Sequence, residues 1–367
     1  MEPNSTLEEG YRVTINKREA NILLESPRKR LRGACEPTEV TVEDVAAKGS
    51  KRKASAETET PSKKQRGGPN VTDTITNTSE PTTVSVVNVR ANKNKKEDTD
   101  FEAKYLEFDI LGEGGFGSVY AGNRKKDNLP VAIKHIPKVD VECRPVVLKG
   151  KIYRIPMEVF LMLQVGAGPS SAGKSAAVSL LDWYDLDEEV LLVMERPVSS
   201  VDLLTYMDDN DGPLDEDTAK VLMLQLVEAA INMHSKGVFH RDIKSENILI
   251  ETGSNVPRVR IIDFGCGCIV KKRPYRCFSG TPAYGPPEFQ ISGSYEAGPT
   301  TVWQLGALLY EMLDGYKRFN TSKFIRKKIK FNSEMSRDCR GLLRMCLALN
   351  PTERATLEQM QLHPWFT

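Results

Sequence analysis

The sequence lacks the features that would assign it to a membrane or to the secretory pathway. It has no apolar run of the roughly 18 residues that a membrane-spanning helix needs. The polar, acidic start MEPNSTLEEG lacks the basic and apolar regions of a signal peptide. An excess of charge of one sign is also missing, since 51 Lys and Arg face 50 Asp and Glu. We therefore expect a cytoplasmic protein with no membrane partner and no general affinity for nucleic acid.

Cysteine is scarce as well, with seven residues scattered over 367 positions. An odd, scattered set is unlike the disulfide framework of a small secreted domain, so reduced thiols are expected. Cys266 and Cys268 have CxC spacing, which is not typical of zinc sites, and no histidine is close. We expect these two side chains to be ordinary thiols.

Aromatic residues are nearly absent from the first hundred positions, where Tyr11 is the only one. Ser, Thr, Lys, Glu and Pro dominate there, and such a segment cannot bury enough apolar surface to offset the entropy of ordering it. We predict that residues 1–100 form a disordered tail and that residues 101–367 form one folded domain.

The predicted tail carries three basic tracts, at residues 28–32 (RKRLR), 51–53 (KRK) and 63–66 (KKQR). Such tracts are typical of nuclear localisation signals, so we expect cytoplasmic and nuclear localisation. A simply solvated run of charge is an equal alternative. A third reading is weak, non-specific contact between the tail and nucleic acid.

What the sequence does contain is a change of hydrophobic pattern along the folded part. Strand-like runs at residues 105–111 and 129–136 come first, and a long helical pattern follows at residues 215–235. Short strands before long helices indicate an α+β fold with a small β-rich lobe and a larger helical lobe. We place the first lobe at residues 105–194, a hinge at 195–201 and the second lobe at 202–367.

The segment LGEGGFGSVY carries the pattern GxGxxGxV at Gly112, Gly114, Gly117 and Val119. Glycines allow a backbone to approach phosphate oxygens closely. The segment lies between two strand-like runs, whereas a dinucleotide-binding βαβ unit needs a helix that begins at the glycines. We predict a nucleotide-binding hairpin, with a plain glycine-rich hairpin as the alternative.

A lysine and a glutamate further along could complete a phosphate site. Lys134 ends the run VAIK fifteen residues after Val119, where its ammonium could reach ATP phosphates. Glu158 is flanked by apolar residues in the helical pattern IPMEVFLMLQV and needs a cation there. We predict an ion pair between Lys134 and Glu158, with a partly exposed helix charge as the alternative for Glu158.

The most informative segment is HRDIKSEN, residues 240–247. Asp242 can accept or orient the proton of a substrate hydroxyl, Lys244 can neutralise a transferring phosphoryl group, and Asn247 can bind Mg²⁺. Sixteen residues later, Asp263 in IIDFG follows an apolar strand, as a second metal ligand should. The spacing predicts phosphoryl transfer from ATP with Mg²⁺, whereas a charge run by itself would indicate only a solvated turn.

Two further segments bear on the fold. Glu288 in PPE and Arg354 in NPTERAT are predicted to form a buried ion pair. The segment GPSSAGKS, residues 168–175, fits the nucleotide-binding pattern GxxxxGK followed by Ser or Thr. That pattern needs a buried strand before it and a helix after it, and here a helical run comes first and a strand-like run follows. We predict a loop of the small lobe.

Several segments carry a resemblance to a known family: IPMEVFLMLQV, LLDWYDLDEEVLLVMERP, VDLL, HRDIKSENILIE, TVWQLGALLYEM and CLALNPTERATLEQMQLHPWF. Residues 105–367 resemble the eukaryotic protein kinase domain, and these segments look like the Pim family of serine/threonine kinases. The resemblance implies the two-lobed kinase fold, ATP and Mg²⁺ as cofactors, and protein substrates. Lys244, two residues after Asp242, favours serine and threonine over tyrosine targets.

The resemblance also implies the residues of an ATP site. Pro197 in the hinge has no N–H, so one hydrogen bond to adenine is missing, and the carbonyl of Glu195 remains as an acceptor. The implied ATP-binding residues are Leu111, Gly112, Glu113, Gly114, Gly115, Phe116, Gly117, Ser118, Val119, Ala132, Lys134, Glu195 and Leu249. The implied catalytic residues are Lys134, Glu158, Asp242 and Lys244, and the implied metal ligands are Asn247 and Asp263.

Pim kinases prefer basic substrates, which implies that Asp202 and Glu246 bind Arg or Lys near the target residue. An ordinary surface charge is the alternative for each. Ser245 stands where the family has an aspartate, and Tyr316 stands where it has another acid, so we expect a looser or shifted selectivity. We expect a monomer.

The family also lacks the aspartate that most kinases have two residues before Trp303, where Thr301 stands here. The support beneath His240 and Arg241 must therefore be built differently. Ser279 stands where the family has an aspartate. Phosphorylation of Ser279 could supply the charge that orders this loop against Arg241. The alternative is a loop that packing and backbone contacts order.

These observations predict an active serine/threonine protein kinase. The alternative is a catalytically weak pseudokinase or scaffold with a basic nuclear-targeting tail, although every catalytic residue is present. A third hypothesis makes the tail the functional part of the chain.

Overall fold

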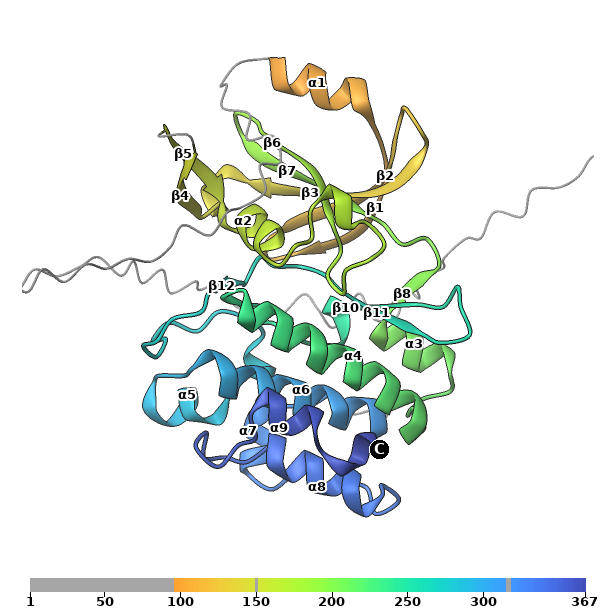
Figure 1. Ribbon diagram of the computed structural model, residues 1–367, viewed down its shortest axis with the longest axis vertical. Coiled ribbons are helices and arrows are strands. Elements are labelled where there is room, and N and C mark those ends of the chain that lie inside the picture. The colour runs from red at the N-terminus through yellow and green to blue at the C-terminus, as the bar shows by residue number, and fades with distance from the viewer. Residues whose placement is uncertain (1–95, 149–150, 315–317) are drawn as a thin grey trace, which may run out of the picture. The chain divides into compact units, whose positions relative to one another are not determined.

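The computed structural model describes residues 96–148, 151–314 and 318–367 (Figure 1). Most of the predicted disordered tail, with its basic tracts, and Tyr316 lie outside these ranges. Sheet strands come first along the described chain and most of the helices follow, so the predicted α+β fold of two lobes is confirmed. None of the described helices is both long and apolar enough to cross a membrane.

A five-stranded antiparallel sheet forms the small lobe, in the order β1-β2-β3-β7-β6. Its strands are Tyr105–Gly114 (β1), Gly117–Arg124 (β2), Leu129–Pro137 (β3), Leu180–Asp185 (β6) and Glu189–Glu195 (β7). Alternation along the central strands separates two faces, because successive strand residues point to opposite sides. One face carries a small core of Tyr105, Val131, Ile133, Tyr184, Leu191 and Val193. The other face, with Ile136 and Leu192, joins the main core together with helix α2 (Met157–Gln164).

Helix α1 (Lys96–Lys104) begins before the predicted domain boundary at residue 100. Phe101 stacks on Tyr105 with ring centroids 5.7 Å apart and meets the edge of Tyr184 at 5.4 Å. The Lys104 ammonium lies 2.9 Å from an Asp100 carboxylate oxygen. The first aromatic side chain of the domain is therefore carried on a helix that starts in the polar segment.

Two long helices, α4 (Glu216–Ser235) and α6 (Ala297–Asp314), form the centre of the large lobe. Asp215 accepts a hydrogen bond from the Thr218 N–H at 2.8 Å and caps α4, so the predicted helix is confirmed. Every residue of α6 from Thr300 to Leu313 is buried. The shorter helices of this lobe are Leu203–Asp209 (α3), Pro287–Ser292 (α5), Thr321–Ile325 (α7), Arg337–Cys346 (α8) and Leu357–Gln361 (α9).

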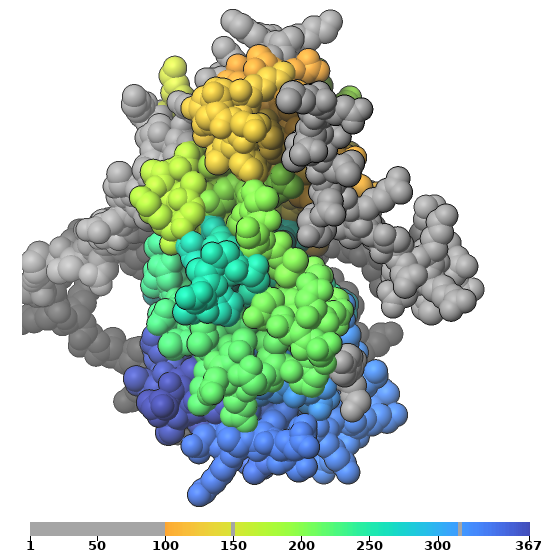
Figure 2. Space-filling view, turned by 90° about the vertical axis from the view of Figure 1, so that its right-hand side faces the viewer, coloured from red at the N-terminus to blue at the C-terminus, as the bar shows by residue number. Residues whose placement is uncertain are grey.

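Short strands lie where the two lobes meet. Strands β8 (Ser200–Asp202), β10 (Ile248–Glu251) and β11 (Arg258–Ile261) form one sheet, and β9 (Val238–Phe239) pairs with β12 (Cys268–Ile269). The predicted hinge therefore ends inside β8. The hairpin of β4 (Cys143–Leu148) and β5 (Lys151–Pro156) precedes α2. In Figure 2 the green and teal atoms of the junction lie between the yellow atoms of the small lobe and the blue atoms of the last helices.

Two local predictions are confirmed. Arg354 and Glu288 form a buried two-point ion pair, with Nη1–Oε1 and Nη2–Oε2 distances of 2.9 and 2.7 Å. Residues 168–175 form a loop with one short 3₁₀ turn between α2 and β6, so they do not have the strand and helix of a P-loop.

Candidate active site

A cleft of about 720 Å³ lies between the glycine-rich hairpin, the hinge and the short strands of the large lobe. Twelve of the thirteen predicted ATP-binding residues line it, as do Glu158, Asp202, Asp242, Lys244, Glu246, Asn247 and Asp263. Ser118 does not line the cleft, because its neighbour Val119 does and alternate strand residues point to opposite faces. Sequence reasoning missed the lining residues Val178, Met194, Arg196, Val198, Ser200, Ile262, Gly280, Thr281 and Pro282.

The glycine-rich segment is the tip of the β1–β2 hairpin, so the strand, turn, strand context predicted for it is confirmed. Gly117 has φ of +121°, and a Cβ there would lie 1.9 Å from the His135 carbonyl oxygen. Only glycine fits at position 117, because β2 approaches β3 too closely there for a side chain. A Cβ at Gly112, Gly114 or Gly115 would meet nothing within 4 Å. That open space is where a phosphate chain can approach the backbone.

Lys134 joins β3 to helix α2 through a buried ion pair. Its Nζ lies 2.8 and 3.0 Å from the two Glu158 carboxylate oxygens and 2.8 Å from Asp263 Oδ1. Burial alone would lower the pKa of the Lys134 ammonium, but the two carboxylates outweigh it and raise that pKa. The lysine is therefore charged and held in place, and the predicted contact with Glu158 is confirmed.

Asp263 projects from the turn after β11 into the same cleft. Its φ of +62° lies in the left-handed region, a strained conformation that is typical of functional sites. Burial raises the pKa of its carboxyl, but Lys134 and the Gly265 N–H, 3.1 Å from Oδ1, lower it below its usual value. The next residue, Phe264, is buried and packs edge-on against His240 with ring centroids 4.9 Å apart. This packing fixes the direction of Asp263.

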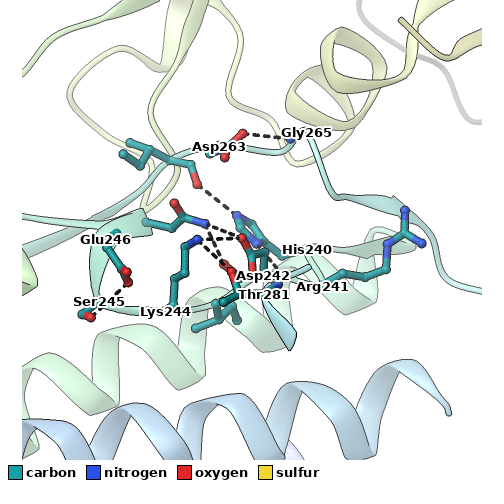
Figure 3. Close-up of polar contacts among 12 residues, drawn as sticks. His240, Arg241, Asp242, Lys244, Ser245, Glu246, Asp263, Gly265 and Thr281 are labelled. Atoms are coloured by element: carbon teal, nitrogen blue, oxygen red, sulfur yellow. Dashed lines mark hydrogen bonds and ion pairs between the residues drawn. The ribbon is translucent and has the colours of Figure 1, made fainter. Parts of the chain in front are cut away.

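Polar contacts within the catalytic loop 240–247 and to neighbouring segments hold it in place (Figure 3). His240 Nε2 donates to the Ile262 carbonyl at 3.1 Å, and Nδ1 accepts from the Asp242 N–H at 3.3 Å. Burial lowers the pKa of this imidazole, which agrees with a neutral ring that donates once and accepts once. Asn247 Nδ2 donates to the Asp242 carbonyl at 2.8 Å and to its side chain Oδ2 at 3.2 Å.

Each carboxylate oxygen of Asp242 has its own partner. Its Oδ1 accepts from the Thr281 N–H at 2.7 Å, and its Oδ2 lies 3.2 Å from Lys244 Nζ. Lys244 also donates to Thr281 Oγ1 at 2.8 Å. An ordered carboxylate with an ammonium beside it can take up a hydroxyl proton while the lysine neutralises charge on a nearby phosphoryl group.

Gln304 provides the support for the catalytic loop that the sequence did not assign. Its Nε2 donates to the Arg241 carbonyl at 2.6 Å, and its Oε1 accepts from the Ile243 N–H at 3.4 Å. Arg241 has φ of +68°, so this amide holds a strained backbone immediately before Asp242. Thr301 instead contacts His234 at 2.9 Å. The expectation of a different support is confirmed, and its signal was a buried polar residue inside the apolar helix α6.

The segment after Asp263 is ordered by backbone and aromatic contacts. The Arg241 side chain donates to the carbonyls of Cys266 and Gly267, the latter at 3.1 Å. Tyr275 and Tyr295 exchange backbone hydrogen bonds at 2.8 and 3.0 Å, and their rings stack with centroids 5.3 Å apart. Arg241 therefore has hydrogen-bond partners without a phosphate on Ser279. This agrees with the alternative that packing and backbone contacts order the loop.

The two acids predicted to bind substrate differ in their surroundings. Asp202 caps α3, accepting from the N–H and hydroxyl of Thr205 at 3.0 and 2.8 Å. Glu246 is partly exposed and pairs with Arg318. Ser245 is fully buried, and its hydroxyl lies near Glu246 and Glu311. Ser245 does not line the cleft, and the looser or shifted selectivity stays a prediction.

The donor set of the cleft fits Mg²⁺. In the described residues no three His, Cys, Asp or Glu side chains converge to hold a metal by themselves. Asn247 and Asp263 offer one amide oxygen and one carboxylate, and Mg²⁺ is commonly bound by one or two such groups together with substrate phosphates. The residues present therefore suit a metal that arrives with a nucleotide.

Residues 105–366 match the protein kinase domain family, so the chain belongs to the protein kinases. Members of this family use ATP and Mg²⁺. Among its relatives is the serine/threonine-protein kinase pim-2 of Danio rerio, which is 40% identical over 276 residues, or 74% of this chain and 87% of that protein. The chain is a Pim-like protein serine/threonine kinase, as its motifs predicted.

More distant relatives are also serine/threonine or sperm motility kinases by name. The serine/threonine-protein kinase prk-2 of Caenorhabditis elegans is 34% identical over 262 residues, 70% of this chain and 56% of that protein. Sperm motility kinase 2B of Mus musculus is 31% identical over 276 residues, 73% of this chain and 53% of that protein. The chain thus spans about half the length of these two relatives.

Proposed function

We propose that the chain binds ATP and Mg²⁺ in the 720 Å³ cleft and phosphorylates Ser or Thr in proteins that carry Arg or Lys near the target. One observation supports this most. Lys134, Asp242, Asn247 and Asp263 come from separate segments and all line the same cleft. The pseudokinase alternative is disfavoured because each of these groups is present and has partners that hold it at the cleft.

The roles follow from the contacts. Lys134, held by Glu158 and Asp263, would bind phosphate oxygens, and the open glycines would place backbone N–H groups beside them. Asn247 and Asp263 would hold Mg²⁺, which neutralises phosphate charge when it is bound. Asp242 would accept or orient the hydroxyl proton, and Lys244 would lie beside the transferred group.

A preference for basic substrates is supported by the two acids on the wall of the cleft, Asp202 and Glu246. A carboxylate at the rim of a site can bind the guanidinium of an incoming Arg. The monomeric state, the weak nucleic-acid contact and the cytoplasmic and nuclear localisation stay predictions.

The purified chain is expected to phosphorylate Ser and Thr peptides from a randomised library and to leave Tyr peptides unmodified. Among the Ser and Thr peptides, those with Arg or Lys near the target should be enriched. Incorporation of labelled phosphate is the measurement, with the Asp242→Asn variant as the background. Incorporation no higher than in that variant would contradict the proposed activity, and equal use of basic and neutral peptides would contradict the substrate preference alone.

The Ser279→Ala variant is expected to keep the turnover number of the wild type. The physical reason is that the Arg241 guanidinium already donates to two backbone carbonyls, and Thr281 already contacts Asp242. Turnover of wild type, Ser279→Ala and Ser279→Asp would be compared, and mass spectrometry would report phosphate at Ser279. A fall in Ser279→Ala that Ser279→Asp restores would support ordering by phosphorylation instead.

A further inference from the structure

One of the two acids on the substrate side of the cleft already has a cationic partner from the same chain. The Arg318 guanidinium contacts Glu246 Oε1, and the two side chains are 51% and 38% exposed. Glu246 lines the cleft together with Asp242 and Lys244, whereas Arg318 lies outside the lining. The cationic partner of Glu246 is therefore not itself a residue of the cleft wall.

The position of Arg318 is fixed by its buried neighbour. Phe319 is fully buried, and its N–H donates to Glu311 Oε1 at 2.7 Å. Its ring meets Trp303 and Tyr310 with centroids 5.8 Å apart in each case. The backbone of Arg318 is thus anchored one residue from the core of the large lobe.

Glu246 is tied to the same buried carboxylate. The hydroxyl of the preceding residue, Ser245, lies 3.2 Å from Glu246 Oε2 and 3.4 Å from Glu311 Oε2. Because Glu311 contacts both Ser245 and the N–H of Phe319, the two ends of the ion pair share one buried anchor. The backbones of Arg318 and Glu246 are thus held at a separation that their side chains can bridge.

The local charge favours this pair. Partial burial raises the pKa of Glu246, but its hydrogen bond to its own backbone and the Arg318 guanidinium outweigh burial and lower it. Residues 318–330 contain six Lys and Arg and no acid. An incoming basic side chain would therefore meet a carboxylate that is already paired, next to a segment of its own sign.

We propose that Arg318 is a specificity-determining residue that occupies Glu246 from within the chain and thereby weakens selection of basic substrates. The proposal rests on the proposed use of Glu246 as a substrate-binding acid. A substrate Arg must displace Arg318, so the free energy needed to break the internal ion pair reduces the binding free energy of the substrate. Partly exposed ion pairs contribute about 0.2–1 kcal/mol, which corresponds to a factor of about 1.4–5 in affinity.

The test uses two peptides with the same target serine, one with arginines near it and one with glutamines in their place. In Arg318→Ala, the ratio of kcat/KM for the arginine peptide to that for the glutamine peptide should rise about 1.4–5-fold over wild type. The change should come from a lower KM for the arginine peptide. Arg318→Lys, which keeps the charge, should restore a ratio close to that of wild type.

Two further variants separate specificity from a general effect of charge. Arg326→Ala removes an exposed arginine of the same basic segment and should raise the ratio less than Arg318→Ala. Glu246→Gln combined with Arg318→Ala should abolish the gain, because no carboxylate is then released for the peptide. Thermal unfolding of each variant reports whether the fold has changed.

The outcomes distinguish the two proposals. An unchanged ratio in an active Arg318→Ala variant would overturn the role of Arg318. The same would hold if Arg326→Ala raised the ratio equally, since the effect would then be one of general charge. A wild-type protein that phosphorylates no Ser or Thr peptide would instead overturn the proposed function.

Discussion

Replacing Asp242 with Asn is expected to lower the turnover number for peptide phosphorylation by about 10²–10⁴-fold. The carboxylate that would take up the hydroxyl proton is lost, while the amide keeps a carbonyl oxygen for the Thr281 N–H. The ion pair with Lys244 is also lost. The melting temperature should change little, because Asn has almost the same shape. Steady-state turnover and thermal unfolding are the measurements.

Asp217→Asn is the matched control for this substitution. It makes the same chemical change in a side chain that is 95% exposed on α4, so turnover should stay at the wild-type level. If Asp242→Asn retained turnover close to that of wild type, Asp242 would have no catalytic role. A wild-type protein no more active than Asp242→Asn would favour the scaffold alternative.

Replacing Lys134 with Met is expected to reduce turnover by about 10²–10³-fold, the range typical for loss of one preorganised electrostatic group. It should also reduce the free energy of unfolding by about 3–5 kcal/mol, because Glu158 is left buried without its cation. The loss of activity follows from the position of Lys134 in the cleft. The loss of stability follows from the burial of both partners. Turnover and denaturant unfolding would measure the two effects separately.

Two comparisons separate chemistry from stability. Lys220→Met is the matched control, since this partly exposed lysine lies 3.7 Å from Asp217 in a weak surface pair. The double variant Lys134→Met with Glu158→Leu should recover part of the lost stability but none of the turnover. Wild-type turnover in Lys134→Met would contradict the proposed role of Lys134, and full stability would contradict the burial argument.

The residues predicted for chemistry were found because each belongs to a short segment with its own local signal. HRDIKSEN, IIDFG and the glycine-rich hairpin keep their functional groups within a few positions, so spacing along the chain predicts spacing in the site. Lys134 and Glu158 are 24 residues apart, yet the strand and helix patterns around them were clear enough to predict their contact. The same patterns predicted α4 and the order of the two lobes.

Two features of the structure were not predicted from the sequence, and they have a common cause. Helix α1 starts in the polar segment and brings Phe101 onto the aromatic pair Tyr105 and Tyr184. Ser245 lies within the catalytic segment, but the 3₁₀ turn at residues 245–247 directs it into the core. Neither feature can be predicted from a short stretch of sequence, because each depends on which residues distant in the sequence pack against the side chain.

The sequence by itself determined the class of protein, the two-lobed fold and the groups that would carry out phosphoryl transfer, because these depend on local patterns and fixed spacings. Only the tertiary structure decided how the backbone before Asp242 is supported and which partner Glu246 has. Gln304 reaches Arg241 across 63 residues, and Arg318 reaches Glu246 across 72. Such contacts depend on how α6 and the chain after it pack beneath the catalytic loop. Packing brings together side chains that no spacing along the chain relates.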